Sequence, residues 1–276
     1  MLNDVVSFLA QEHAEEAATT APHTPAPPPE LLFHIAGWPI TNTILTAWLV
    51  MVVLVLFAWL STRKMREHPS GAQNFWEIVV ELWSGVAENN MGRRRARRFL
   101  PLVLTAFLFI LFSNWIGILP ISYITVVNEE HHTVPLFRSA NSDLNITAAM
   151  AILMIVLAEF FELRAMGGLG YLKGLLVPNP MRWIEIFTRP LSLSFRLFGN
   201  IFAGEVLLLT MIAVAPYVLF VFLALEMFVG LIQALIFSML SLVFLSIATM
   251  HEEHGHHDEY ESATQHEVEA AAEAHA

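Results

Sequence analysis

The sequence predicts an all-α polytopic membrane protein with five transmembrane helices, one amphipathic interfacial helix, and a long tilted hairpin made by the last two helices. Composition is the first reason, because 56% of the 276 residues are hydrophobic and only 14% are charged, against about 25% in soluble proteins. Several apolar runs approach or exceed the ~18 residues that cross a bilayer. Basic residues flank these runs, as in helical membrane proteins. The runs lack the alternation expected of a β-barrel.

The N-terminal part predicts an external tail followed by the first span. Residues 1–34 contain no Lys or Arg and lack the basic start of a signal peptide, so we interpret them as a polar tail. Residues 38–60 form the first apolar run, and Arg63 and Lys64 follow it directly. Basic residues favour the cytoplasmic side, so this span runs inward.

Residues 74–90 predict a helix that lies along the cytoplasmic membrane surface. Three acidic side chains and one serine recur there at steps of four, three and four, which places them on one helical stripe; they are Glu77, Glu81, Ser84 and Glu88. The segment is too polar to span the bilayer, and it could also pack against a soluble subunit. Five arginines between positions 93 and 98 precede the second span, 99–119. We interpret them as a topology anchor rather than a nucleic-acid patch.

Three further spans are predicted. The first covers 144–163, with Ser142 or Asp143 as its N-cap. The sequences GGLG and PNP then indicate a cytoplasmic loop, and Pro190 is expected to begin the next span. That span runs outward to residue 215, Pro216 breaks it, and residues 217–250 return inward.

The distribution of charge predicts the orientation. All Lys and Arg residues except Arg138 and Arg196 fall on the predicted cytoplasmic side, which places the N-terminus outside and the C-terminus inside. Residues 35–250 thus form the membrane domain, and residues 251–276 form an acidic, His-rich cytoplasmic tail. The tail sequence HEEHGHH lacks the second histidine of a zinc-binding HExxH motif, so we predict no metal site there.

The fourth span carries charge inside the membrane. Arg196, Asn200 and Glu205 lie within it, although an arginine at the bilayer centre costs about 2.5–3.5 kcal/mol on insertion scales. At 100° per residue, Asn200 shares a face with Arg196, whereas Glu205 points to the opposite side about 13.5 Å away along the axis. The last span carries Glu226 and Gln233 on a common face.

Folding the last two spans about Pro216 brings these residues to matching levels. Glu205 and Glu226 come to one level near the outside, and Arg196 and Gln233 come to a deeper one. Ionisable groups inside membranes mark ion pathways, so this layout predicts an outer half-channel that ends at a fixed positive charge. Asn200 and Gln233, taken singly, would serve equally as contacts between helices.

Four stretches carry a resemblance to a known family. RPLSLSFRLFGNIFAGE, LEMFVGLIQALIF, SNWIGILPI and SANSDLN resemble subunit a of the F-type ATP synthase, over roughly residues 35–250. The resemblance implies a non-catalytic, proton-conducting stator subunit in a bacterial inner membrane, with two offset half-channels. The implied partners are the c-ring, the peripheral-stalk subunit b and the rest of the synthase, together with lipid and protons. It implies no cofactor and no nucleic acid.

The resemblance also assigns roles to residues. Arg196 matches the essential arginine that faces the c-ring carboxylate, and four residues match polar positions of the proton path: Asn200, Glu205, Glu226 and Gln233. Three match positions near the outer mouth: Asn114, Asp143 and Asn145. Gly117 stands where some members have an aspartate. For the cytoplasmic half-channel the candidates are Glu185 and, as rivals, Glu159 and Glu162.

Other functions stay open at this point. A sodium-translocating version of the same subunit would share these features, because ion choice rests mainly on the c subunit. A stand-alone transporter usually shows repeated halves with paired broken helices, and no such repeat is visible in this sequence. A purely structural membrane scaffold would use Arg196 for assembly and not for ion flow.

Overall fold

The computed structural model describes residues 29–35, 37–63, 71–119, 124–127, 133–176 and 181–250. The tail before residue 29 and the tail after residue 250 lie outside this part of the chain. Within it, five helices are long and apolar enough to cross a membrane, and a sixth helix, α3, is amphipathic. The predicted all-α membrane fold is therefore confirmed, apart from two small β-hairpins on the side predicted to face outward, which is called the outer side below.

A β-hairpin leads into the first span. Strands β1 (Leu31–Ile35) and β2 (Trp38–Thr41) pair antiparallel, and Gly37 adopts a positive φ of 85° between them, a conformation that glycine tolerates best. Helix α2 (Asn42–Thr62) follows at once, because the Thr41 side chain caps it by accepting a hydrogen bond from the Ile44 backbone N–H. The prediction that this span begins at Trp38 is therefore wrong, since Trp38 belongs to β2.

Helices α3 (Ala72–Met91) and α4 (Arg93–Ile118) are joined by Gly92 alone, which has a φ of 76°. The arginine run therefore forms the first turns of α4 instead of preceding it. Arg95 holds this corner, because its guanidinium donates to the Met91 carbonyl oxygen at 2.7 Å and to the Thr249 carbonyl oxygen at 3.0 Å. These oxygens end α3 and α7, where helices leave carbonyl groups without partners.

The α3 helix has the two faces expected from the sequence. Glu77, Glu81 and Glu88 are exposed, whereas Trp83 and Met91 are buried. The Trp83 ring packs against Phe107 of α4, with 5.1 Å between ring centroids. The acidic stripe therefore points away from the helices that α3 covers.

A short outer loop connects α4 to α5. It contains the hairpin of β3 (Thr125–Val127) and β4 (Thr133–Pro135) and the 3₁₀ turn η2 (Ala140–Ser142). Helix α5 (Leu144–Leu176) then continues well beyond the predicted end at residue 163, with a kink at Gly167, whose φ is 71°. The GGLG sequence thus bends a helix and does not form a loop, because one glycine with a positive φ absorbs the change of direction.

Helices α6 (Met181–Val214) and α7 (Leu219–Thr249) form the predicted hairpin, joined by the turn η3 (Pro216–Val218). Helix α6 begins nine residues before Pro190, so Pro190 lies inside it and does not start it. Proline is tolerated inside membrane helices, where neighbouring groups compensate for the missing hydrogen bond.

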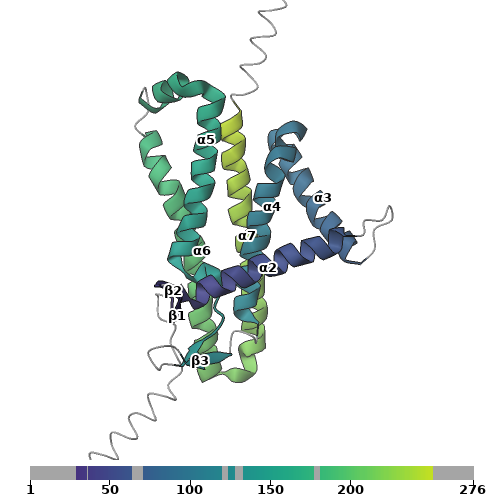
Figure 1. The fold of residues 1–276 in the computed structure, drawn as a ribbon, viewed down its shortest axis with the longest axis vertical. Coiled ribbons are helices and arrows are strands. Elements are labelled where there is room, and N and C mark those ends of the chain that lie inside the picture. The colour runs from purple at the N-terminus through teal and green to yellow at the C-terminus, as the bar shows by residue number, and fades with distance from the viewer. Residues whose placement is uncertain are drawn as a thin grey trace, which may run out of the picture.

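The two helices of the hairpin are much longer than the first span. At about 1.5 Å per residue, α6 is ~51 Å long and α2 only ~31 Å, whereas the hydrocarbon core is ~30 Å thick. Figure 1 shows α2 crossing the long helices α4 to α7 at a steep angle, while those helices run alongside one another. If α2 stands near the membrane normal, α6 and α7 must be strongly tilted.

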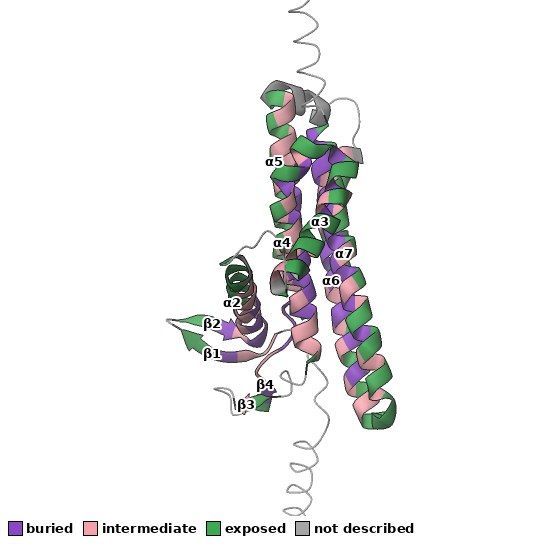
Figure 2. Ribbon diagram, turned by 90° about the vertical axis from the view of Figure 1, so that its right-hand side faces the viewer, coloured by how far each residue is buried: buried purple, intermediate pink, exposed green. Residues whose placement is uncertain are grey.

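The core lies where α3 to α7 meet. Its large side chains include Trp83, Ile110, Leu197, Phe237 and Leu245. Small buried residues of α7, among them Ala234 and Ser238, face this core and let helices approach closely, as in membrane bundles. The outward faces carry exposed large apolar residues instead, which lipid would cover (Figure 2).

Candidate functional site

The outer acids lie beside each other at the interface of α6 and α7. The Glu226 carboxylate occupies the space above Gly204, because a Cβ added to that glycine would lie only 2.0 Å from the Glu226 Oε1 atom. Gly204 directly precedes Glu205 in α6. Glu226 is 7% exposed. Glu205 and Glu226 therefore lie at the same level of the hairpin, as counting residues from Pro216 predicted.

The sequence did not predict the partner of Glu205. Arg138, from the outer loop, forms an ion pair with the Glu205 carboxylate. Its Nε lies 3.1 Å from Oε1 and 3.0 Å from Oε2, and its Nη2 lies 2.9 Å from Oε2. The Arg138 side chain is only 4% exposed, and its backbone N–H donates to the Thr46 hydroxyl oxygen at 3.2 Å. One signal was available, since Arg138 is the lone basic residue on the predicted outer side.

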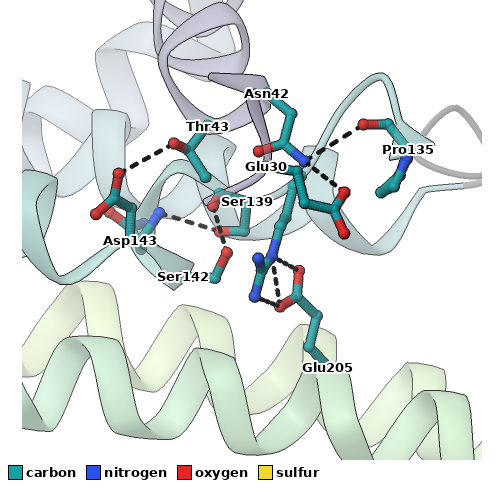
Figure 3. A network of polar contacts seen from close by, with 10 residues as sticks. Glu30, Asn42, Thr43, Pro135, Ser139, Ser142, Asp143 and Glu205 are labelled. Atoms are coloured by element: carbon teal, nitrogen blue, oxygen red, sulfur yellow. Dashed lines mark hydrogen bonds and ion pairs between the residues drawn. The ribbon is translucent and has the colours of Figure 1, made fainter. Parts of the chain in front are cut away.

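A polar network surrounds this ion pair (Figure 3). Asp143 caps α5, because its Oδ1 accepts the Asn145 backbone N–H at 2.8 Å, while its Oδ2 accepts the Thr43 hydroxyl at 3.1 Å. Asn42 donates to Glu30 and to the Pro135 carbonyl oxygen. The outer loop is thereby tied to the start of α2 and of α5.

Asn114 links three elements in the buried interior. Its side-chain N–H donates to the Gly230 carbonyl oxygen of α7 at 3.2 Å, and its Oδ1 accepts from Asn141 of η2 at 2.7 Å. The nearby Gly117 lies against the backbone of the outer loop, where an added Cβ would come within 2.6 Å of the Ser139 Cβ. That close approach explains why a side chain cannot stand at position 117 in this chain.

The middle of the hairpin differs slightly from the expected register. Gln233 is buried, and its Oε1 accepts from the Asn200 side chain at 2.6 Å. The structure thus pairs Gln233 with Asn200, whereas counting residues from Pro216 had predicted Gln233 at the level of Arg196. Arg196 lies one turn deeper, at a cavity of about 340 Å³ whose walls include Ser192, Leu240 and Phe244.

Arg196 is exposed on the surface of α6. Among the described residues, none forms a hydrogen bond or an ion pair with its guanidinium. A charge on a membrane helix that has no partner among the described residues would need one from elsewhere, because an uncompensated charge at bilayer depth is costly.

The inner end of the hairpin gathers the three acids that the sequence offered as rivals. Together with Arg182 and Arg189 they line a second cavity of about 340 Å³; they are Glu159, Glu162 and Glu185. Arg182 forms an ion pair with Glu162 and lies 3.9 Å from Glu159. Arg189 pairs with Glu185 one turn away, and it also lines the cavity at Arg196. The two cavities are therefore neighbours.

The described residues contain no group of three or more His, Cys, Asp and Glu side chains that could hold a metal ion. The His-rich tail from residue 251 onward, where a metal site was considered and rejected, lies outside the described part of the chain.

Comparison with known proteins identifies the family. Residues 44–246 match the ATP synthase A chain family. The ATP synthase subunit a of Gloeobacter violaceus is 37% identical over 220 residues, which cover 78% of this chain and 86% of that protein. The subunit a of Moorella thermoacetica is 33% identical over 79% of this chain and 95% of its own length. For Mycobacterium leprae the identity is 34%, over 78% and 88%. The chain therefore belongs to the family of subunit a of the F-type ATP synthase, a non-catalytic membrane subunit of that complex.

Proposed function

We propose that this subunit conducts protons between the two sides of the membrane through two offset half-channels, which meet at Arg196. One observation carries the proposal: an exposed arginine without a partner among the described residues lies between an outer acid cluster and an inner cavity. Arginine stays charged under all physiological conditions. It can therefore act as a fixed barrier that a proton does not cross.

The outer half-channel would use the acids at the α6–α7 interface. Glu226 and Glu205 lie side by side there, and Asp143, Asn145 and Asn114 lie in the polar network that borders them. Buried ionisable and hydrogen-bonding groups at membrane depth are the usual lining of proton relays. In this proposal, protons enter from the outside and reach a carboxylate of the rotating c-ring.

Arg196 would meet that carboxylate. Once protonated, a carboxyl group is neutral, and the cost of burying it in lipid falls sharply. It can then travel with the rotor through the membrane. When it returns to Arg196, the guanidinium favours its ionised form and so promotes release of the proton. The Asn200–Gln233 pair, one turn away, would keep α6 and α7 in register beside this point.

The inner half-channel would be the acidic cavity near the cytoplasmic ends of α5 and α6. It offers carboxylates from Glu159, Glu162 and Glu185, and it adjoins the cavity at Arg196 through Arg189. We propose that all three acids belong to one exit. A charge that crosses the full membrane potential gains about 2.3 kcal/mol per 100 mV, and this is the energy that the complex couples to ATP synthesis.

The surroundings follow from the same proposal. The subunit would lie in a bacterial inner membrane with its N-terminus outside and its C-terminus in the cytoplasm, as the basic residues indicate. The c-ring would cover the exposed face at Arg196. The acidic stripe on α3 and the cytoplasmic end of the bundle would contact subunit b and the remaining stator.

The test is Arg196→Ala in the assembled synthase. We expect ATP-driven proton pumping into inverted vesicles to be abolished, because the barrier and the partner of the rotor carboxylate are both removed. Arg94→Ala removes the same charge from an exposed position in the first turn of α4, and it should leave pumping intact. Normal pumping by Arg196→Ala would refute the central role of this residue.

A further inference from the structure

We infer that Arg138 is a positioning residue of the outer proton path: it holds Glu205 as a fixed anion and leaves Glu226 as the outer acid that exchanges the proton. The inference rests on the proposed function. It assigns different roles to Glu205 and Glu226, which the sequence alone did not distinguish. Its basis is the difference between the contacts of the two carboxylates.

Both oxygens of Glu205 are engaged by one guanidinium. Nε lies within 3.1 Å of each oxygen, and Nη2 lies 2.9 Å from Oε2. The Nε–H group donates to both oxygens, and Nη2 adds an ion-pair contact. Hydrogen bonds between two charged groups are roughly twice as strong as those between neutral groups. A proton placed on Glu205 would remove the negative charge that these contacts require, which is unfavourable beside a buried arginine.

Arg138 is itself held in place. Its backbone N–H is anchored to Thr46 of α2 at 3.2 Å. The neighbouring Ser139 accepts from the Ser142 hydroxyl at 2.8 Å, which closes the loop into the turn η2. With its side chain 4% exposed, the guanidinium cannot leave Glu205 for water without opening the loop.

Glu226 has a different environment. Among the described residues, none donates a hydrogen bond to its carboxylate or forms an ion pair with it. It packs against the backbone at Gly204 instead. A proton can therefore arrive and leave without breaking any contact that the structure shows, whereas the same event on Glu205 disrupts the Arg138 pair.

Other charged and polar groups lie near Glu205. Glu30 is the acid whose charge acts on it, Arg138 is the base that does so, and the Ser142 hydroxyl donates a hydrogen bond to it; the charge of Glu205 acts in turn on Glu226. Asp143 is occupied by Thr43 and by the start of α5. Among these groups, Arg138 is the base that favours the anionic form of Glu205.

A double-mutant cycle in the complete synthase tests the inference. The variants are Arg138→Gln, Glu205→Gln, both together, and Arg138→Lys as the conservative change. The readout is passive proton conductance of vesicles stripped of the catalytic head, driven by a potassium diffusion potential and divided by the amount of subunit a in the membrane.

We expect each single glutamine variant to lower conductance by about tenfold or more, because one partner of a buried pair is left uncompensated. The double variant should recover to within about threefold of wild type, since neither charge is left alone. Arg138→Lys should conduct better than Arg138→Gln, because the charge is kept although the guanidinium geometry is lost. The pH profile of the double variant should match that of wild type, because Glu226 is the titrating acid in both.

Three results would overturn the inference. One is a double variant as inactive as Glu205→Gln, which would mean that Glu205 carries the proton itself. Another is full conductance in Arg138→Gln. The third is wild-type conductance in Glu226→Gln. If Arg138→Gln fails to assemble, the double variant and Arg138→Lys still decide between the two roles. A failure of the proposed function is recognised separately, by Arg196→Ala that still pumps.

Discussion

The two ends of the α6–α7 hairpin carry similar charges in different settings. At the outer end, the Arg138–Glu205 pair joins a loop to a helix across 67 positions of sequence, and its side chains are 4% and 20% exposed. At the inner end, the Arg189–Glu185 pair joins residues one turn apart on the same helix, and its side chains are 34% and 49% exposed.

The difference in burial separates a rigid site from an adaptable one. A buried ion pair is costly to break, because the group left behind has neither water nor a partner. An exposed pair within one helix contributes little, since water replaces the lost partner. Glu205 is thus held in one arrangement, while the inner acids line a cavity of about 340 Å³ in which several carboxylates can exchange partners.

The sharpest challenge to this contrast is Arg138→Ala. Removing one partner of a fully buried pair costs about 3–5 kcal/mol, and the cost here is smaller because the Glu205 side chain left behind is 20% exposed. Subunit a in this variant should still lose resistance to heat in detergent. The measurement is the temperature at which the subunit aggregates or leaves the purified complex. A midpoint equal to that of wild type would show that the outer pair is no more important than a surface pair.

Gly204→Ala tests whether the position of the Glu226 carboxylate matters when no charge is changed. The added Cβ would lie 2.0 Å from the Glu226 carboxylate, so Glu226 must move although no charge changes. Since a displacement of about 1 Å can reduce a rate up to 100-fold, we expect proton conductance to fall about tenfold or more.

The same change should not unfold the helix, because alanine is a better helix former than glycine by about 0.8–1.0 kcal/mol. Gly85→Ala in α3 is the matched control, since nothing lies within 4 Å of its added Cβ, and its conductance should equal that of wild type. Undiminished conductance in Gly204→Ala would mean that the placement of Glu226 is unimportant.

Asp143→Ala sharpens the account of how the outer loop is held. Loss of an N-cap costs about 0.5–2 kcal/mol, and the bond from Thr43 of α2 is lost with it. Asn145→Ala should cost less, because its side chain is exposed and its backbone N–H can still reach Asp143. Heat resistance of the two variants in detergent is the measurement, and equal loss in both would contradict the capping role.

The smallest effect is expected at the inner end. Arg189→Gln removes the i,i+4 pair with Glu185, which at this exposure contributes about 0.3–0.5 kcal/mol. Heat resistance should therefore change little. A loss as large as that of Arg138→Ala would abolish the contrast between the two ends of the hairpin.

The sequence predicted those contacts of the hairpin that depend only on where the chain turns between its last two helices. Because Pro216 fixes where the hairpin turns, counting residues placed Glu205 beside Glu226 and brought Gln233 to within a turn of its observed level. It could not predict Arg138 as the partner of Glu205, since that contact depends on the path of an outer loop whose own contacts are tertiary.

Helix boundaries were the other failure. Gly167 and Pro190 were interpreted as parts of a loop and a helix start, as they would be in a soluble protein. In a membrane protein, the need to satisfy backbone hydrogen bonds internally favours continuing a helix through such residues. Glu185 meets Glu159 and Glu162 in one cavity because α6 begins nine residues before Pro190, whereas the two acids of α5 already lie within the predicted span.

The proline inside α6 has a mechanical consequence. Residue 190 has no N–H, so the Ile186 carbonyl oxygen loses the helical bond it would otherwise accept. Ile186 lines the inner cavity, where water can satisfy that oxygen. A helix that lacks one backbone hydrogen bond bends most easily at that position. Pro190 therefore gives α6 a point of low bending stiffness between its inner segment and the segment that carries Arg196.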